Sequence, residues 1–592
     1  MAGEPYVVLR DFRIWFAKRQ PFLDALRGIE PSYVKAVDGI DLTVAKGEVY
    51  CLVGESGCGK TTTGKGILHL VEATGGDIFV GAPPDVLERY ETARTHEDRS
   101  TAERIRRQWS LAYREPPETR QERSFAVLMA LCGTALGGIL AAALAASVNL
   151  VVRGLWSALA FLALAVVLAF VGTLPPVPTT ERLPKRLVAS SLLGVFIGAY
   201  LATAFGLRAA GLPAHAAAVV GAYFDTWELN LLLLCFQILI AVSATWWITK
   251  VLMRRRRRKE GIDVGKVGRL RKAAQIIFQD PYESLNPKLS VFDTVAEPLV
   301  VNRITRSRPE LDTRVRQALD DAGLRPPGDF MFRYPHELSG GQRQRVSIAA
   351  ALVLDPDFLV ADEPVSMLDV SIRTEILELL LELRAKKGLT YLFITHDLSL
   401  AWVLSDRIGV MYLGKIVEEG PTQEIIRNPR HPYTKALVSV VPVPDPDRRR
   451  ERIILKGERP DPSNVPPGCR FHPRCPVAFE KCGWTADEVA AELKGVTMEK
   501  PVGVSLEDIR VEGPPSLTIR AASGGVDAWL RNQIDAHSEE SRCLKAVRSI
   551  EPMDGGVRVA LHEGLEPALR DVAPNVKVAC HLYGELHEAS GS

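Results

Sequence analysis

A phosphate-binding loop is the clearest chemical signal in the sequence. The run from Gly54 to Thr61, GESGCGKT, fits the pattern G-x-x-x-x-G-K-[ST] between an expected strand and an expected helix. Glycines let successive backbone N–H groups turn toward an anion, and the N-terminus of the helix adds its dipole. Lys60 would bring a positive charge to the β- and γ-phosphates, and Thr61 would offer a hydroxyl to Mg²⁺. The pattern predicts a nucleoside triphosphate site, against the alternative of a chance Gly-rich turn.

Two adjacent carboxylates give the second signal. The apolar run that begins at Phe358 reads as a strand and ends in Asp362 and Glu363. Asp362 is suited to the Mg²⁺ shell, and Glu363 is suited to orient or deprotonate an attacking water. Alone, a strand that ends in Asp-Glu is usually only solvated. Together with the phosphate loop, the pair predicts hydrolysis of the nucleotide.

The elements that must position these residues lie in two separated stretches. Short β-rich runs fill residues 1–81, and strands alternate with helical stretches over 269–430, which favours a parallel sheet flanked by helices. We therefore expect one α/β ATPase domain, split by an insert at 82–268 and followed by a mixed α/β, cysteine-containing region at 431–592.

The insert contains a very apolar block. Four runs without charged residues, at 125–152, 155–177, 187–207 and 229–249, are each long enough to cross a bilayer. A run of arginines from Arg254 to Arg258 follows them, as expected on a cytoplasmic side. The block predicts an all-α insert of four transmembrane helices, the last extended to about residue 252, with both ends in the cytoplasm. A buried soluble helical bundle is the alternative, which does not explain the arginines.

Further motifs resemble a known family. Leu338 to Gln342, LSGGQ, resembles the signature motif of ABC-type ATPases, and the run from Ser366 to Asp369 resembles their D-loop. The segments IIFQDPYESLNP, RYPHELSGGQRQR, MYLGKIVEEGPT and HPYTKAL are similar to the oligopeptide/dipeptide importer branch, most of all to the second of its two paired ATPase subunits.

The resemblance implies roles for particular residues. Glu363, the switch histidine His396 and the Q-loop Gln279 would be catalytic, and Gln279 would also join Thr61 and Asp362 around Mg²⁺. Phe16, preferred to Trp15, would stack on adenine. The remaining nucleotide contacts would be made by Gly54, Ser56, Gly57, Gly59, Lys60, Thr61, Thr62, Asp362, Ser339, Gly340, Gly341 and Gln342.

The cysteines of the C-terminal region raise a separate question. Their spacing, Cys469-x5-Cys475-x6-Cys482, is not that of paired zinc-finger ligands. In the family the matching segments supply cysteines that can hold an iron–sulfur cluster, which implies Cys469, Cys475, Cys482 and Cys580 as ligands of a [4Fe–4S] cluster. Cys543 is a rival for the fourth position, and zinc or free thiols remain the alternatives.

Composition limits the possible functions. Among 592 residues, 73 Lys and Arg against 71 Asp and Glu leave a formal charge of +2, so no global footprint for nucleic acid is present. Nine cysteines are too few for a disulfide scaffold, and no signal peptide opens the chain, so we expect a cytoplasmic N-terminus.

The expected function is ATP hydrolysis that energises uptake of peptides or a related solute at the cell membrane, with the ATPase domain on the cytoplasmic side. The resemblance implies ATP and Mg²⁺, a paralogous ATPase subunit in a head-to-tail pair, two permease subunits and an extracytoplasmic solute-binding protein. A non-transport ABC ATPase and an atypical membrane-anchored exporter component are the alternatives.

Overall fold

The computed structural model describes residues 3–18, 32–96, 98–112, 264–305, 307–441, 451–495, 509–513, 516–520, 526–537, 541–554 and 556–584. Contacts among them define one unit, Met1–Tyr113 together with Gly265–Ser592. A second unit, Arg114–Val264, lies almost wholly outside the described residues.

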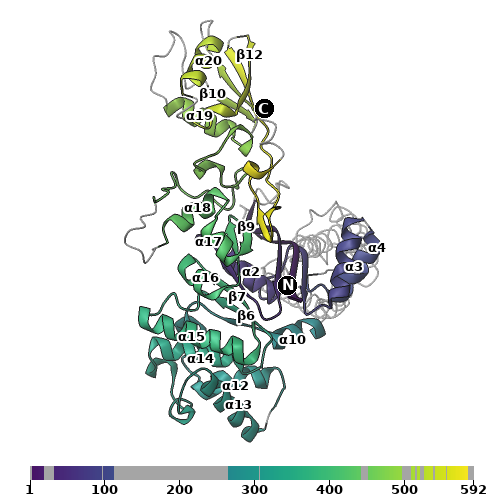
Figure 1. Ribbon diagram of the computed structural model, residues 1–592, viewed down its shortest axis with the longest axis vertical. Helices are drawn as coiled ribbons and strands as arrows, with labels where there is room; N and C mark the ends of the chain where they lie inside the picture. Colours follow the sequence, from purple (N-terminus) through teal and green to yellow (C-terminus); the bar gives the residue numbers. More distant parts are fainter. Residues whose placement is uncertain are drawn as a thin grey trace, which may run out of the picture. The chain divides into compact units, whose positions relative to one another are not determined.

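A mixed sheet of eight strands organises this unit (Figure 1). Five neighbouring strands run parallel, in the order β8-β3-β7-β6-β5, and three strands, β9, β15 and β14, extend the β8 edge in antiparallel fashion. The strands are β3 (Val49–Val53), β5 (Ala274–Ile277), β6 (Phe358–Asp362), β7 (Thr390–Thr395), β8 (Arg407–Tyr412), β9 (Lys415–Pro421), β14 (Arg570–Ala573) and β15 (Val576–Val578). Every residue of β3, β6 and β7 is buried, as expected for central parallel strands covered on both faces.

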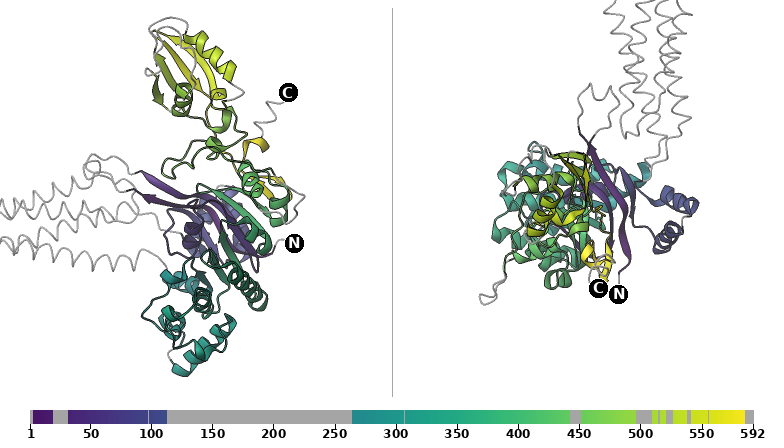
Figure 2. Two further views of the ribbon diagram at one scale, coloured as in Figure 1. Left: turned by 90° about the vertical axis from the view of Figure 1, so that its left-hand side faces the viewer. Right: turned by 90° about the horizontal axis from the view of Figure 1, so that it is seen from above.

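The N-terminal strands form a second, antiparallel sheet of three strands, in the order β2-β1-β4 (Figure 2). Its strands are β1 (Pro5–Ala17), β2 (Tyr33–Ala45) and β4 (Gly75–Val80). Phe12 and Ile14 of β1 share a core with Val360 of β6 and Ile394 of β7. The phosphate-loop helix α2 (Lys60–Ile67) adds Ile67 to this core, so two sheets fix its position.

Most helices pack on the large sheet or on one another. Helix α14 contacts α12, α13 and β5, which makes it the centre of the helical group in Figure 1. The remaining helices of this part are α3 (Pro84–Thr95), α4 (Arg99–Trp109), α10 (Val264–Ala273), α11 (Pro281–Ser284), α12 (Val291–Val301), α13 (Arg308–Asp321), α14 (Gly340–Leu352), α15 (Val370–Lys387), α16 (Leu398–Leu404), α17 (Thr422–Arg427) and α18 (Pro432–Ser439).

The C-terminal region builds a smaller sheet with its own core. Strands β10 (Ile509–Gly513), β11 (Ser516–Arg520), β13 (Gly556–Leu561) and β12 (Val547–Met553) lie in that order, all antiparallel. Helices α19 (Ala486–Gly495) and α20 (Val526–His537) contact this sheet. The chain enters and leaves this module side by side, because a Cβ on Gly564 would lie 2.2 Å from the Cα of Gly483.

The predicted fold class needs a correction. The described residues form a mixed α/β fold, and none of the helices among them is both long and apolar enough to cross a membrane. Helix α15 has the length, at 18 residues, but only one of its faces is apolar, and charged residues from Arg373 to Lys387 occupy the rest. The predicted all-α insert of four transmembrane helices, at 125–152, 155–177, 187–207 and 229–252, is therefore no part of this fold. Those ranges lie outside the described residues.

Candidate functional site

The phosphate loop joins the central strand β3 to helix α2. Gly54 and Gly59 leave no room for a side chain, because a Cβ would lie 2.2 Å from the carbonyl oxygen of Met411 or 2.1 Å from that of Ala36. Gly59 caps the helix with a φ of 110°, a conformation that L side chains rarely adopt. The loop is thus pressed against neighbouring backbone, which fixes its curvature. Ser56 and Gly57 lie at its exposed rim, and Thr62 is half-buried in the first turn of α2.

Lys60 lies inside this loop. Its side chain is buried, and Nζ donates to the carbonyl oxygens of Gly54 at 2.8 Å and Glu55 at 3.1 Å. A buried ammonium needs such partners. The arrangement presents one fixed positive charge within the curve of the loop.

Thr61 of the phosphate loop contacts Asp362 at the end of β6, although 301 positions separate the two residues in the sequence. The Thr61 hydroxyl donates to Oδ1 of Asp362 at 2.8 Å. Burial raises the pKa of Asp362, while the bond from Thr61 and the charge of Lys65 act against that shift. A hydroxyl and a buried carboxylate are hard oxygen donors of the kind that Mg²⁺ prefers, so this pair fits the cation.

Glu363, the residue after Asp362, contacts two further side chains. Nε2 of Gln279 donates to Oε2 of Glu363 at 3.0 Å, and Nδ1 of His396 lies 3.2 Å from Oε1. The backbone of Glu363 has a φ of 45°, and its N–H donates to the carbonyl of Ile394 at 2.9 Å. A non-glycine residue held at positive φ next to a buried carboxylate, here Asp362, is typical of functional sites. Glu363 thus contacts both of the other predicted catalytic side chains.

The LSGGQ residues form the start of helix α14. Oγ of Ser339 accepts from the Gln342 N–H at 3.3 Å, and Oε1 of Gln342 accepts from the Ser339 N–H at 3.0 Å. This reciprocal capping satisfies two of the free donors at the helix start. In Gly341 a Cβ would lie 2.7 Å from Cγ2 of Ile372, so α15 supports the turn closely. Within the described part of the chain, no hydrogen bond or ion pair joins residues 339–342 to the phosphate loop.

The predicted adenine-stacking residue ends strand β1. Phe16 is paired with Val34 of β2, and 45% of its surface is exposed. The neighbouring Trp15 is engaged elsewhere, since its Nε1 donates to Asp38 at 2.9 Å and Lys35 lies 5.0 Å over its ring. Phe16 is therefore the aromatic ring that is free to meet a ligand.

Three residues at the phosphate loop escaped the sequence analysis. Nη1 of Arg474 donates to both carboxylate oxygens of Glu55, at 3.1 and 2.9 Å, and the Glu55 N–H donates to Oη of Tyr433 at 3.0 Å. More than 370 positions separate these partners along the chain. The lone arginine before Cys475 and the tyrosine in HPYTKAL gave no local signal for this contact.

The four predicted cluster ligands lie around one small cavity. Cys469, Cys475, Cys482 and Cys580 line it, whereas Cys543 belongs to the separate core of the C-terminal module. Burial raises the pKa of all four thiols, to about 12 for Cys475 and about 11 for Cys482, and repulsion from neighbouring cysteines adds to the pKa shifts of Cys469, Cys475 and Cys482. Among the described residues, however, no group of three or more His, Cys, Asp or Glu side chains is arranged as it stands to hold a metal ion.

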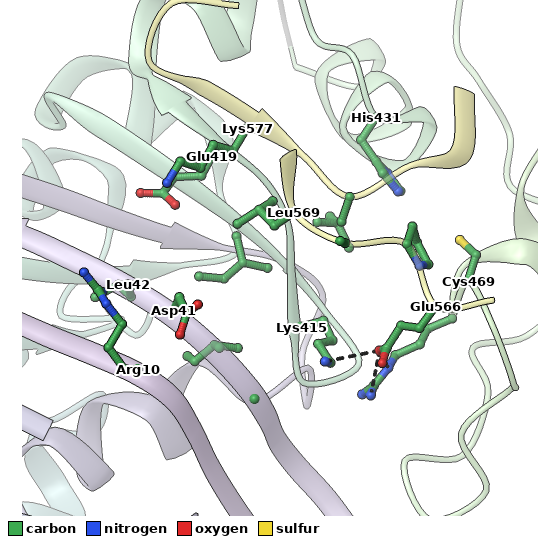
Figure 3. Close-up of a pocket in the computed structure, with 18 of the residues that line it drawn as sticks. Arg10, Asp41, Leu42, Lys415, Glu419, His431, Cys469, Glu566, Leu569 and Lys577 are labelled. Atoms are coloured by element: carbon green, nitrogen blue, oxygen red, sulfur yellow. Dashed lines mark hydrogen bonds and ion pairs between the residues drawn. The ribbon is translucent and has the colours of Figure 1, made fainter. Parts of the chain in front are cut away.

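A larger cavity, of about 640 Å³, lies between β2, β9 and residues 566–569 (Figure 3). Ion pairs occupy its wall: Glu566 lies 3.3 Å from Nζ of Lys415 and 3.1 Å from Arg470. Of the predicted site residues, only Cys469 lines it. The candidate nucleotide site is therefore the open surface between the phosphate loop, β1 and the ends of β6 and β7.

Comparisons with known proteins agree with this geometry. A family model for ABC transporters matches residues 37–126 and 250–366, and one for the C-terminal region of oligopeptide/dipeptide transporters matches residues 417–482. The dipeptide transport ATP-binding protein of Haemophilus influenzae is 51% identical over 212 residues, which cover 36% of this chain and 64% of that protein.

Two further relatives have similar names. The oligopeptide transport ATP-binding protein AppF of Bacillus subtilis is 51% identical over 215 residues, 36% of this chain and 64% of that protein. A Brucella ovis relative, named as a peptide import ATP-binding protein, is 46% identical over 235 residues, 39% of this chain and 73% of the relative. The chain belongs to the ABC transporter family of ATP-binding proteins, in its oligopeptide/dipeptide branch. It spans just under two thirds of the length of the Haemophilus and Bacillus relatives.

Proposed function

We propose that this chain is the ATP-hydrolysing subunit of an importer for oligopeptides, dipeptides or a related solute. One observation carries the proposal. Glu363 is held by Gln279 and His396 directly beside the Thr61–Asp362 pair at the foot of the phosphate loop. A general base, its orienting partners and a hard-oxygen cation site thus lie around one point.

Binding of the nucleotide follows from the loop. Backbone N–H groups of residues 57–61 and the charge of Lys60 would hold the β- and γ-phosphates, and Phe16 would stack on adenine. Thr61 and Asp362, with Gln279, would hold Mg²⁺. When bound, that cation supplies positive charge to the phosphate oxygens.

Hydrolysis would depend on Glu363. Its carboxylate accepts from Gln279 and lies beside His396, so its two oxygens have fixed directions. We assign Glu363 the role of orienting the attacking water and accepting its proton, and His396 and Gln279 the role of positioning groups that also meet the γ-phosphate.

The signature motif requires a second ATPase subunit. Residues 339–342 make no hydrogen bond to their own phosphate loop in the described part of the chain, yet they present a capped helix start that suits an anion. In a head-to-tail pair each signature would cover the γ-phosphate of the other subunit. The family favours a paralogous partner, two permease subunits and an extracytoplasmic solute-binding protein, with this subunit on the cytoplasmic face of the cell membrane.

The test compares two variants in the purified complex. Glu363→Gln should retain ATP binding and lose hydrolysis by about a hundredfold or more, because only the general base is removed. Lys60→Ala should instead weaken ATP binding. Both are measured with the partner subunit's site inactivated. Hydrolysis by Glu363→Gln at the parental rate would refute the assignment.

We propose further that Cys469, Cys475, Cys482 and Cys580 are the ligands of an iron–sulfur cluster, most simply [4Fe–4S]. Two observations support this donor set: the four thiols line one cavity, and Cys543 lies in another core. As they stand, the four described thiols are not arranged to hold a metal ion, so loading would require these side chains to move.

This second proposal is tested by anaerobic purification. We expect iron and acid-labile sulfide in the protein, both lost in Cys475→Ser and both kept in Cys543→Ser. Stoichiometric zinc without iron, or equal losses in the two variants, would contradict the assignment.

A further inference from the structure

Residues 459–463, which precede Cys469, lie beside the candidate nucleotide site. The N–H of Lys35 in β2 donates to the carbonyl of Pro462 at 3.3 Å, and Nζ of Lys18, just after Phe16, donates to Oγ of Ser463 and lies 3.9 Å from Asp461. These contacts seat residues 461–463 beside the end of β1 that carries Phe16.

The same segment reaches the phosphate loop through Arg459. A Cβ built on Gly57 would lie 3.1 Å from both Nη1 and Nη2 of Arg459 and 3.5 Å from Cζ, so the guanidinium points its two terminal nitrogens at the exposed rim of the loop. Arg459 is exposed, and no hydrogen bond or ion pair is formed by its side chain with the described residues. An exposed guanidinium without such a partner therefore lies at the rim of a candidate anion site.

A second contact keeps this arrangement in place. Arg474, 15 positions further along, is largely buried and pairs with Glu55, two residues before Gly57. Both anchors follow Arg459 in the chain: residues 461–463 contact the ends of β1 and β2, and Arg474 pairs with the phosphate loop. The segment's position beside Gly57 follows from these anchors and not from Arg459 itself.

We propose that Arg459 is a further nucleotide-binding residue, whose guanidinium contacts the phosphates of ATP and ADP from the rim of the loop. Lys60 holds the phosphates from inside the loop, and Arg459 faces them from outside. A planar guanidinium suits two phosphate oxygens at once and stays charged at any relevant pH. This inference rests on the proposed function, since it assumes that the loop binds a nucleotide.

The test measures dissociation constants of Mg-ATP, Mg-ADP and AMP for the full chain by equilibrium titration. Arg459→Gln should weaken Mg-ATP and Mg-ADP about tenfold, the loss of one charge-assisted contact, and affect AMP less. Arg459→Lys should lie between, because it keeps the charge and loses the fork. Lys456→Gln removes an exposed charge three residues away and is the matched control.

Two results would contradict these expectations, each in a different way. Equal affinities in Arg459→Gln and Lys456→Gln would overturn the role of Arg459 and leave the proposed function intact. A parental protein that binds ATP no better than Lys60→Ala would instead overturn the proposed function. Salt gives a separate readout, since the difference between Arg459→Gln and the parent should shrink as ionic strength rises.

Discussion

At the scale of single residues, the site combines a buried positive charge with a buried negative one. Lys60 donates hydrogen bonds to backbone carbonyls, whereas among the described residues Asp362 has the Thr61 hydroxyl as its one hydrogen-bonded side-chain partner. Because its pKa is raised, the ionised form of Asp362 lowers the free energy of unfolding at neutral pH, and that cost shrinks as the pH falls through its folded-state pKa toward the unfolded-state value. The nucleotide-free protein thus tolerates a charge that only a cation would fully compensate.

Asp362→Asn tests this reading. The amide keeps an acceptor for Thr61 and removes the charge, so the nucleotide-free variant should melt at a higher temperature than the parent at pH 7.5. The advantage should diminish at lower pH, where Asp362 itself takes up a proton. Affinity for Mg²⁺ in the presence of ATP should fall by at least about tenfold. Thermal melts with and without Mg-ATP measure both effects, and an unchanged gain from Mg-ATP would contradict the role of Asp362.

At the scale of elements, the start of helix α14 has two tasks in the proposed function: it caps the helix and it binds an anion. Ser339 caps it, as Ser290 caps α12, where Oγ accepts from the Asp293 N–H at 3.1 Å. Loss of either cap should cost about 1 kcal/mol of stability. Only Ser339 is expected to meet a nucleotide, so the two serines form a matched pair.

The prediction is made in the Glu363→Gln background, where the partner's site is the remaining source of hydrolysis. Adding Ser339→Ala should lower the ATPase rate of the complex about a hundredfold, as for the loss of one preorganised donor to developing charge. Adding Ser290→Ala should leave the ATPase rate unchanged, apart from any effect of the stability that the lost cap removes. Equal rates in the two double variants would show that the signature serine acts only as a cap.

The motifs explain which elements the sequence could predict. The phosphate loop and the Asp362–Glu363 strand end carry their chemistry in a few consecutive residues, so their surrounding β3, α2 and β6 followed from local pattern. The addition of β15 to β9 did not, because it depends on Val578 and Glu418 meeting over 160 positions. The Arg474–Glu55 contact is equally non-local. Apolar runs were the weakest guide, since hydropathy alone led to a transmembrane fold class that the described helices do not support.

At the scale of the whole molecule, the proposed function needs groups from more than one place in the described unit. Its catalytic carboxylate and its signature motif belong to one chain, but no hydrogen bond or ion pair links residues 339–342 with Lys60 or Glu363 among the residues that the structure covers. In the proposed head-to-tail pair, two subunits would meet to close each site, and ATP in the gap would hold them together. The C-terminal segment, through Arg474 and Tyr433, ties the family-specific region to the loop that binds the phosphates.

Uptake of peptide is the measurement that tests the central claim most directly. The complex isolated through this chain is placed in proteoliposomes with its solute-binding protein, and accumulation of a labelled dipeptide or oligopeptide is followed with and without ATP. We predict ATP-dependent accumulation by the parental complex and its loss in a complex that carries Glu363→Gln in this chain. Uptake by the Glu363→Gln complex at the parental rate would contradict the account.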